Sequence, residues 1–236
     1  MIPVQVNRAT SLCALVLIIA CRPAGGAKQG SESTTVASTE TASVAAQKPA
    51  ADSIITRADL ARIQGSPSAP IWVIEASDFQ CPYCKDWHEQ TYKTLVDQYV
   101  KTGKVRLAYV NFPLQSHAHA LHAAEAAMCA GAQGKFWPMH DALFTTQAQW
   151  QSRGPTQVFD SLARAQGVQM EPWRNCVASG KMRPLIVADA DRASRAGVRA
   201  TPSFMIGNQL LVGAQSIDDL RRVIDSALAK SKRTTP

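Results

Sequence analysis

A pair of cysteines separated by two residues, Cys81-Pro82-Tyr83-Cys84, constrains the fold of this chain more than any other feature. The apolar run at 71–74 predicts a buried strand before the pair, and apolar residues at helical spacing over 95–100 predict a helix after it. The first turn of that helix would favour the thiolate of Cys81, and Pro82 suits that turn because it lacks an N–H. This context predicts a redox pair that closes and reopens a disulfide. The alternative is a metal site with His88, although no second CxxC or HxxxH follows.

The start of the chain predicts an export signal over residues 1–20. Arg8 provides a positive charge, and the apolar run at 12–20 is too short for a comfortable membrane span. The run Ile18-Ile19-Ala20-Cys21 is similar to a bacterial lipobox, in which cleavage precedes a cysteine that becomes lipid-modified. We therefore expect a lipid anchor on Cys21 that holds the protein at a membrane surface. An ordinary secretory peptide and an uncleaved anchor are the alternatives.

Residues 21–53 predict a flexible tether. From position 22 onward this segment has no aromatic residue and no Leu, Ile or Met, so it cannot bury enough apolar surface to offset its ordering entropy. A low-complexity region without function is the alternative. The net charge of the whole chain is +7, but its basic residues are scattered. Without a basic stripe and interleaved aromatics, we do not expect nucleic-acid binding.

The count of cysteines predicts a second disulfide. Of the six cysteines, Cys13 and Cys21 lie in the signal region, and acylation of Cys21 would leave two complete pairs in the exported body. Export makes disulfides permissible. Cys129 and Cys176 fall in helix-like stretches, and a bridge between them would stabilise the fold by about 4 kcal/mol in the chain-entropy model. The alternative is two buried, unpaired thiols.

The remaining body, residues 54–236, shows a definite order of elements. The pattern predicts strand, helix, strand, a long run of helices, two strands forming a hairpin, and a last helix that Ser216 caps. After the first two elements, the predicted segments are 104–112, 116–131, 136–144, 156–166, 172–196, 204–206, 210–212 and 216–229. We expect Gly167 and Pro184 to interrupt the helical run.

Three motifs carry a resemblance to a known family. They are EASDFQCPYC at 75–84, GKFW at 134–137 with HDALF at 140–144, and GVRATPSF at 197–204. Together they resemble the DsbA-like thiol–disulfide oxidoreductases, in the branch whose members are often bacterial lipoproteins. The resemblance covers about residues 66–230. It implies an α/β protein with a thioredoxin fold and an inserted helical domain at about 114–195.

The resemblance also implies roles for individual residues. Cys81 matches the exposed nucleophile and Cys84 the resolving cysteine, with Pro82 and Tyr83 as the intervening dipeptide. Thr201-Pro202 matches the loop whose cis proline faces the disulfide and aligns the substrate peptide. Glu75 matches a buried acid that relays protons to or from Cys84. A glutamate on the surface at the end of the strand is the alternative.

The implied function is dithiol–disulfide exchange in the cell envelope. The resemblance implies an enzyme without a cofactor that introduces disulfides into unfolded exported thiol proteins and is recharged by a membrane redox partner. Tyr83 in place of the histidine of strongly oxidising DsbA proteins predicts a less oxidising potential. An envelope reductase or isomerase, a non-catalytic binding module or chaperone, and a metallochaperone remain open. The sequence favours a monomer.

Three further histidines, His117, His119 and His122, invite a metal hypothesis. Histidines at the start of an Ala-rich helix are more often capping or facing solvent, so we expect no metal site there.

Overall fold

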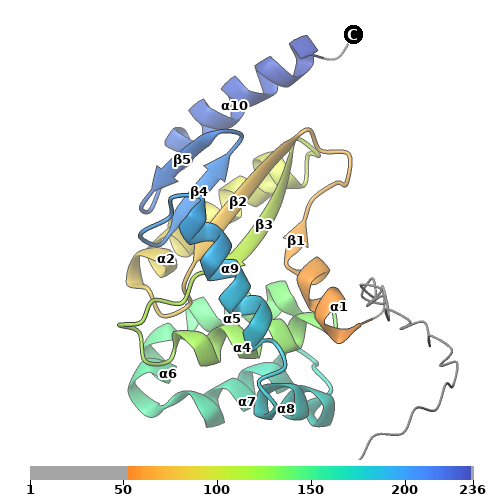
Figure 1. The fold of residues 1–236 in the computed structure, drawn as a ribbon, viewed down its shortest axis with the longest axis vertical. Coiled ribbons are helices and arrows are strands. Elements are labelled where there is room, and N and C mark those ends of the chain that lie inside the picture. The colour runs from red at the N-terminus through yellow and green to blue at the C-terminus, as the bar shows by residue number, and fades with distance from the viewer. Residues whose placement is uncertain (1–52, 235–236) are drawn as a thin grey trace, which may run out of the picture. The chain divides into compact units, whose positions relative to one another are not determined.

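The computed structural model describes residues 53–234. The predicted signal peptide, Cys21 and the tether up to residue 52 lie outside the described residues. Within this range the chain forms a sheet with strand order β1-β3-β2-β4-β5 (Figure 1). The strands are β1 (Ile63–Gln64), β2 (Ile71–Ser77), β3 (Val105–Asn111), β4 (Ser203–Ile206) and β5 (Gln209–Val212). Strands β2 and β3 are parallel, and all other neighbours are antiparallel.

The central strand β2 carries the active-site region at its carboxyl end. Its side chains alternate between the two faces of the sheet, as the period of a strand requires. Glu75 stands in register with Tyr109 of β3 on one side and with Phe204 of β4 on the other. Register partners in neighbouring strands project to the same face, so this carboxyl lies between two aromatic side chains.

A continuous helical run over residues 82–100 follows β2. It consists of α2 (Pro82–Trp87), a π-helical turn (His88–Tyr92), α3 (Lys93–Leu95) and a second π-helical turn (Val96–Val100). Cys81 is the N-cap residue and Pro82 occupies the first helical turn, as predicted. Gly103, with φ of 73°, follows the run and allows the chain to turn into β3.

Six helices separate β3 from β4, in agreement with the predicted insertion. They are α4 (Ala120–Gly131), α5 (Phe136–Thr145), α6 (Gln147–Arg153), α7 (Pro155–Ala165), α8 (Met170–Ala178) and α9 (Arg183–Arg195). Gly167, with φ of 71°, follows α7 as expected. The prediction that Pro184 interrupts a helix is wrong, because this proline lies in the first turn of α9 and the break falls at 179–182.

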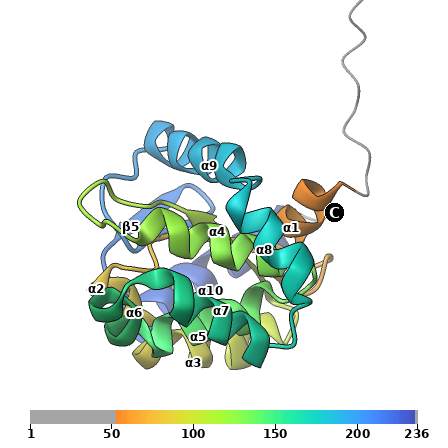
Figure 2. The same cartoon turned by 90° about the horizontal axis from the view of Figure 1, so that it is seen from below.

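Separate apolar clusters cover the two faces of the sheet. The helical run and α10 (Ile217–Thr234) bury Leu95 and Leu220 against Val73 on one face. On the other face Ala193 of α9 packs against Ala76, and Figure 1 shows α9 crossing in front of the sheet. Helices α4 to α8 share a further core with α1 (Ile54–Ala61). Figure 1 shows them below the sheet, and Figure 2 shows them from that side.

The sequence pattern did not indicate α1 or β1. Ser53 caps α1, since its side-chain oxygen accepts a hydrogen bond of 3.0 Å from the backbone N–H of Thr56. Strand β1 pairs with the edge of β3 through two residues only, which is too short for a periodic signal. Among residues 53–234, no helix combines the length and apolar composition that crossing a membrane requires.

Candidate active site

The cysteine pair lies at the junction of β2 and α2, and both residues are free thiols. Cys84 is completely buried, and Cys81 is only 3% exposed. The expectation of an exposed nucleophile is therefore wrong for the reduced form, because the loops around Cys81 enclose its side chain. Tyr83, in contrast, is 64% exposed.

The Thr201-Pro202 loop faces the dithiol. The peptide bond between the two residues is cis, and the thiol of Cys81 donates a hydrogen bond of 3.4 Å to the carbonyl oxygen of Thr201. The loop is held by the N–H of Gly213, which donates to the carbonyl of Pro202 at 2.8 Å. The loop and the nucleophile are thus adjacent, as the resemblance implies; alignment of a substrate by Pro202 stays a prediction.

The two cysteines have opposite acidities. A hydrogen bond from the Cys84 thiol, with help from the backbone N–H groups of Cys84 and Tyr83, lowers the pKa of Cys81 to about 6. Burial and the neighbouring sulfur raise the pKa of Cys84 well above its ordinary value. At neutral pH the pair therefore consists of one thiolate, on Cys81, and one thiol, on Cys84.

Glu75 lies behind the pair and is completely buried. Burial raises its pKa to about 8, an effect that the nearby Ser77 hydroxyl only partly opposes. Among the described residues, neither carboxylate oxygen has a partner within hydrogen-bonding distance and angle. The alternative of a surface glutamate is therefore wrong. The carboxyl changes its protonation state close to neutral pH, which suits a proton acceptor or donor.

Polar side chains that the sequence analysis did not assign hold the active-site loop. Asp78 accepts hydrogen bonds from the backbone N–H groups of Gln80 and Leu114, at 2.7 and 2.8 Å. Gln147 of α6 donates to the carbonyls of Phe79 and Cys81, at 2.8 and 3.0 Å. The loop is thereby fixed to the β3–α4 connection and to the insertion. An aspartate directly after a strand was a detectable signal, whereas Gln147 gave none.

A triad of titratable residues, His88, His140 and Asp141, was also missed. Oδ1 of Asp141 lies 2.8 Å from Nδ1 of His140 and 3.0 Å from Nε2 of His88. Their donor atoms all lie within 4.8 Å of one another. His88 follows Cys84 by one helical turn, so the triad connects the active-site helix with α5. The HD pair within the motif at 140–144 was the available signal.

Cys129 of α4 and Cys176 of α8 are joined in the structure by a disulfide, with an S–S distance of 2.00 Å. The bridge lies within the core of the insertion, since both residues are buried. It ties α4 to α8 through two cysteines that are 47 residues apart in the sequence.

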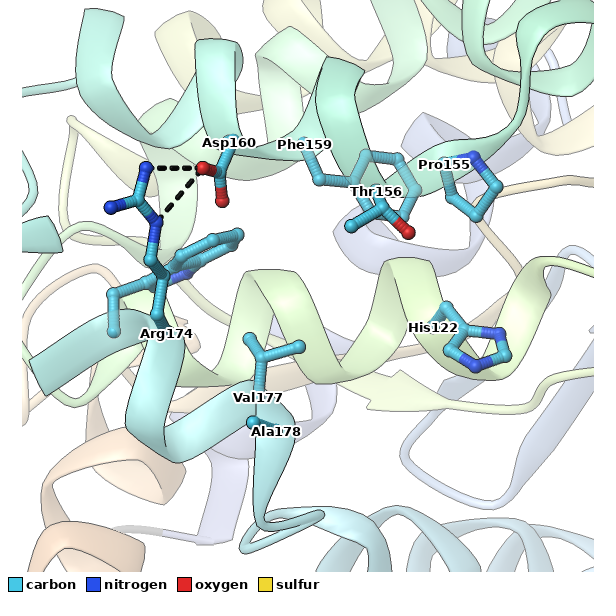
Figure 3. Close-up of a pocket in the computed structure, with 9 residues that line it drawn as sticks. His122, Pro155, Thr156, Phe159, Asp160, Arg174, Val177 and Ala178 are labelled. Atoms are coloured by element: carbon cyan, nitrogen blue, oxygen red, sulfur yellow. Dashed lines mark hydrogen bonds and ion pairs between the residues drawn. The ribbon is translucent and has the colours of Figure 1, made fainter. Parts of the chain in front are cut away.

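The three histidines at the start of the insertion do not converge. Nδ1 of His117 lies 2.7 Å from Oδ2 of Asp78, and His119 is the N-cap residue of α4. His122 lies at the edge of a cavity of about 340 Å³ between α4, α7 and α8 (Figure 3). Figure 3 shows Val177 and Thr156 on opposite sides of this cavity. The cavity is lined by His122, Pro155, Thr156, Phe159, Asp160, Trp173, Arg174, Val177 and Ala178, none of which belongs to the dithiol loop.

Known proteins with similar sequences include members of the thioredoxin family. A family model described as Thioredoxin matches residues 58–226. Over 177 residues the chain is 31% identical to the Na(+)/H(+) antiporter NhaA 1 of Salinispora arenicola, covering 74% of this chain but only 26% of that protein. It is 28% identical to the probable disulfide bond formation protein D of Bacillus anthracis, covering 70% of this chain and 77% of that protein.

Solved structures share the fold. The crystal structure of Wolbachia pipientis alpha-DsbA1 matches with a TM-score of 0.67 and 23% identity, covering 74% of this chain and 94% of that chain. The chain belongs to the thioredoxin family. Its fold is similar to that of the DsbA proteins, which confirms the α/β class and the inserted helical domain.

Proposed function

We propose that this protein is a thiol–disulfide oxidoreductase that introduces disulfide bonds into exported proteins of the cell envelope through the Cys81–Cys84 pair. The observation that carries the proposal is the opposite acidity of the two thiols. A pKa of about 6 on Cys81 stabilises its thiolate and hence the reduced form of the enzyme. An enzyme whose reduced form is stabilised gives up its disulfide readily and acts as an oxidant.

The reaction has two steps. A substrate thiolate attacks Sγ of Cys81 in the oxidised enzyme, which forms a mixed disulfide and releases Cys84 as a thiolate that takes up a proton. A second substrate thiolate then attacks the substrate sulfur of the mixed disulfide, and Cys81 leaves as a stable thiolate. A membrane redox partner recharges the dithiol. The relative named disulfide bond formation protein D supports this direction.

The decisive experiment is equilibration of the dithiol in glutathione buffers, together with oxidation of reduced, unfolded ribonuclease. The pKa of Cys81 lies between the values near 7 of thioredoxin and near 3.5 of DsbA, so we expect a potential between about −270 and −120 mV. A potential at or below that of thioredoxin would instead support a reductase. Failure to oxidise ribonuclease and to reduce insulin would support a non-catalytic module.

We further propose attachment to a membrane through lipid on Cys21, based on the run Ile18-Ile19-Ala20-Cys21. Full-length protein and a Cys21→Ala variant would be compared by membrane fractionation and by mass analysis of the mature N-terminus. We expect the variant to lose its processing or its membrane fraction. Equal membrane association of both, with cleavage at another site, would contradict the anchor.

A further inference from the structure

Two imidazoles and one carboxylate converge where the active-site helical run meets α5. Oδ1 of Asp141 lies 2.8 Å from Nδ1 of His140 and 3.0 Å from Nε2 of His88, and the three atoms all lie within 4.8 Å of one another. In the part of the chain that the structure describes, this is the one group of three or more His, Cys, Asp or Glu side chains with the spacing of metal ligands. Neither cysteine of the dithiol belongs to this group.

The three ligand atoms are of the kinds that zinc accepts. Two histidines and one carboxylate, with water in the fourth position, make up a common zinc site, in which bonds of about 2.0–2.2 Å place neighbouring ligands about 3.3 Å apart. The two separations from Oδ1, 2.8 and 3.0 Å, are close to this spacing. The two nitrogens, at most 4.8 Å apart, need to approach each other by at most about 1.5 Å. Shifts of the side chains alone therefore make room for an ion.

Aromatic packing holds both imidazoles in place. The ring of His88 stacks on the rings of Tyr92 and Phe144, with centroids 5.2 and 5.1 Å apart. His140 is completely buried, and the ring of Phe144 lies 5.0 Å from it in an edge-to-face arrangement. Ligands that are already oriented lose little conformational freedom when an ion binds, which favours binding.

The second nitrogen of each imidazole is free to take the ring proton that a metal ion displaces. An ionised carboxylate only accepts hydrogen bonds, so Nδ1 of His140 and Nε2 of His88 carry the ring protons while they face Asp141. Among the described residues, Nε2 of His140 and Nδ1 of His88 are buried without a hydrogen-bond partner. No donor therefore opposes the move of each proton to the other ring nitrogen, which leaves a lone pair for the ion on each ligand atom.

An open surface cavity of about 490 Å³ gives an ion access to this group. The charged side chains that line the cavity are Asp141, Glu89, Asp97, Lys93 and Lys101. Both lysines form ion pairs with Asp97, and the carboxylates outnumber the ammonium groups, so no excess of positive charge repels a cation. The side chain of Asp141 is 51% exposed, which allows water to complete the ligand shell.

We propose that His88, His140 and Asp141 bind one Zn²⁺ ion, with water as the fourth ligand. His88 follows Cys84 by four residues, and the other two ligands belong to α5. The ion therefore fixes the active-site helical run to the helical insertion. The site is separate from the dithiol, and the inference goes beyond the proposed function and does not depend on it.

The test measures zinc binding to full-length protein that has no free thiol. The protein is oxidised, alkylated with iodoacetamide and freed of metal with a chelator, because thiolates would otherwise bind zinc themselves. It is then titrated with Zn²⁺ in competition with a chromogenic chelator. We expect one ion per chain, a Tm that rises with the zinc concentration, and an X-ray absorption spectrum with nitrogen and oxygen ligands at about 2.0–2.2 Å.

Variants that lose one ligand locate the ion. We expect His88→Gln and Asp141→Asn each to weaken zinc binding at least about tenfold and to abolish the zinc-dependent rise in Tm. The matched control His122→Gln removes an imidazole from α4 and should bind zinc like the wild-type protein.

Three outcomes would overturn the site: no zinc on the wild-type protein, wild-type affinity in Asp141→Asn, or loss of binding in His122→Gln. Asp141 is half-exposed, so its variant keeps the test decisive even if His88→Gln fails to fold. Failure of the proposed function would look different, because zinc binding is measured here without any redox reaction.

Discussion

The thiol of Cys81 lies 3.4 Å from the carbonyl oxygen of Thr201, a residue 120 positions further along the chain. While Cys81 is protonated, below its pKa of about 6, this carbonyl accepts the S–H of the thiol. Once Cys81 is a thiolate the carbonyl loses that donor, and it becomes available to a backbone N–H of a bound peptide. If the Thr201-Pro202 loop binds a substrate peptide, as we expect, the ionisation of Cys81 and peptide binding are linked through this one proton.

The first prediction concerns the acidity of Cys81. Alkylation of the reduced protein by iodoacetamide should fall on Cys81, with a midpoint near pH 6, because the Cys84 thiol stabilises its thiolate. Cys84 should stay unlabelled under the same conditions, since burial raises its pKa. Peptide mapping at each pH provides the measurement. In Cys84→Ala, which removes the donor, we expect a higher midpoint. Labelling that favours Cys84 in the wild-type protein would reverse the assignment of the two cysteines.

The second prediction concerns the pH dependence of stability. Burial raises the pKa of Glu75 from its ordinary 4.5 to about 8 in the folded state. The folded state therefore binds this proton more tightly, and the contribution to stability is complete below pH 4.5 and declines as the pH rises to 8. The loss is at most about 5 kcal/mol, from 1.4 kcal/mol per pKa unit.

Glu75→Gln, which cannot ionise, should lack this decline. Urea denaturation of both proteins between pH 4.5 and pH 8.5 gives the difference in free energy of unfolding. The difference should grow with pH in favour of the variant. Parallel profiles for the two proteins would show that Glu75 titrates with an ordinary pKa in the folded state.

The sequence predicted those parts of the fold that depend on local patterns. The apolar run before Cys81, the proline in the first turn of α2 and the hairpin around Gly207 are all readable over a few residues. The helical insertion also followed from the order of elements. Strand β1 was not predicted, because a strand of two residues shows no periodic pattern in the sequence.

The rest of the site depends on contacts between distant segments. The side chain of Gln147 donates a hydrogen bond to the carbonyl of Cys81, 66 residues away in the sequence. His88 is hydrogen-bonded to Asp141, 53 residues away. A single sequence indicates neither partner, because each side chain is also common on a solvent-exposed helix. The burial of Cys81 was missed for the same reason, since it results from loops that come together only in the folded chain.

The third prediction concerns the disulfide of the insertion. The double variant Cys129→Ala/Cys176→Ala should lose about 4 kcal/mol of unfolding free energy, because the bridge closes a loop with a sequence separation of 47. In the wild-type protein, mild reduction should open Cys81–Cys84 first and leave the buried bridge intact. Mass mapping after graded reduction is the measurement. Two free thiols at these positions in the exported protein would contradict the prediction.

The last prediction concerns Asp189 on α9, which is buried and joins three segments of the fold. Its carboxylate pairs with the buried guanidinium of Arg62 and accepts a hydrogen bond of 2.9 Å from the side-chain amide of Asn111. Asp189→Asn removes the charge but keeps the shape, so Arg62 would remain charged with only Asp59 as an acidic partner. Loss of one member of a buried pair costs about 3–5 kcal/mol, and urea denaturation should show a loss of this order.

The matched control is Asp160→Asn, which removes the acid from the surface pair that Asp160 forms with Arg174. Both variants delete one carboxylate opposite one arginine, but Arg174 is half-exposed and water replaces its partner. We expect no measurable change in the urea midpoint for this control. Equal midpoints for the two variants would show that the Asp189 pair is solvated in the folded protein and does not anchor α9 to the sheet.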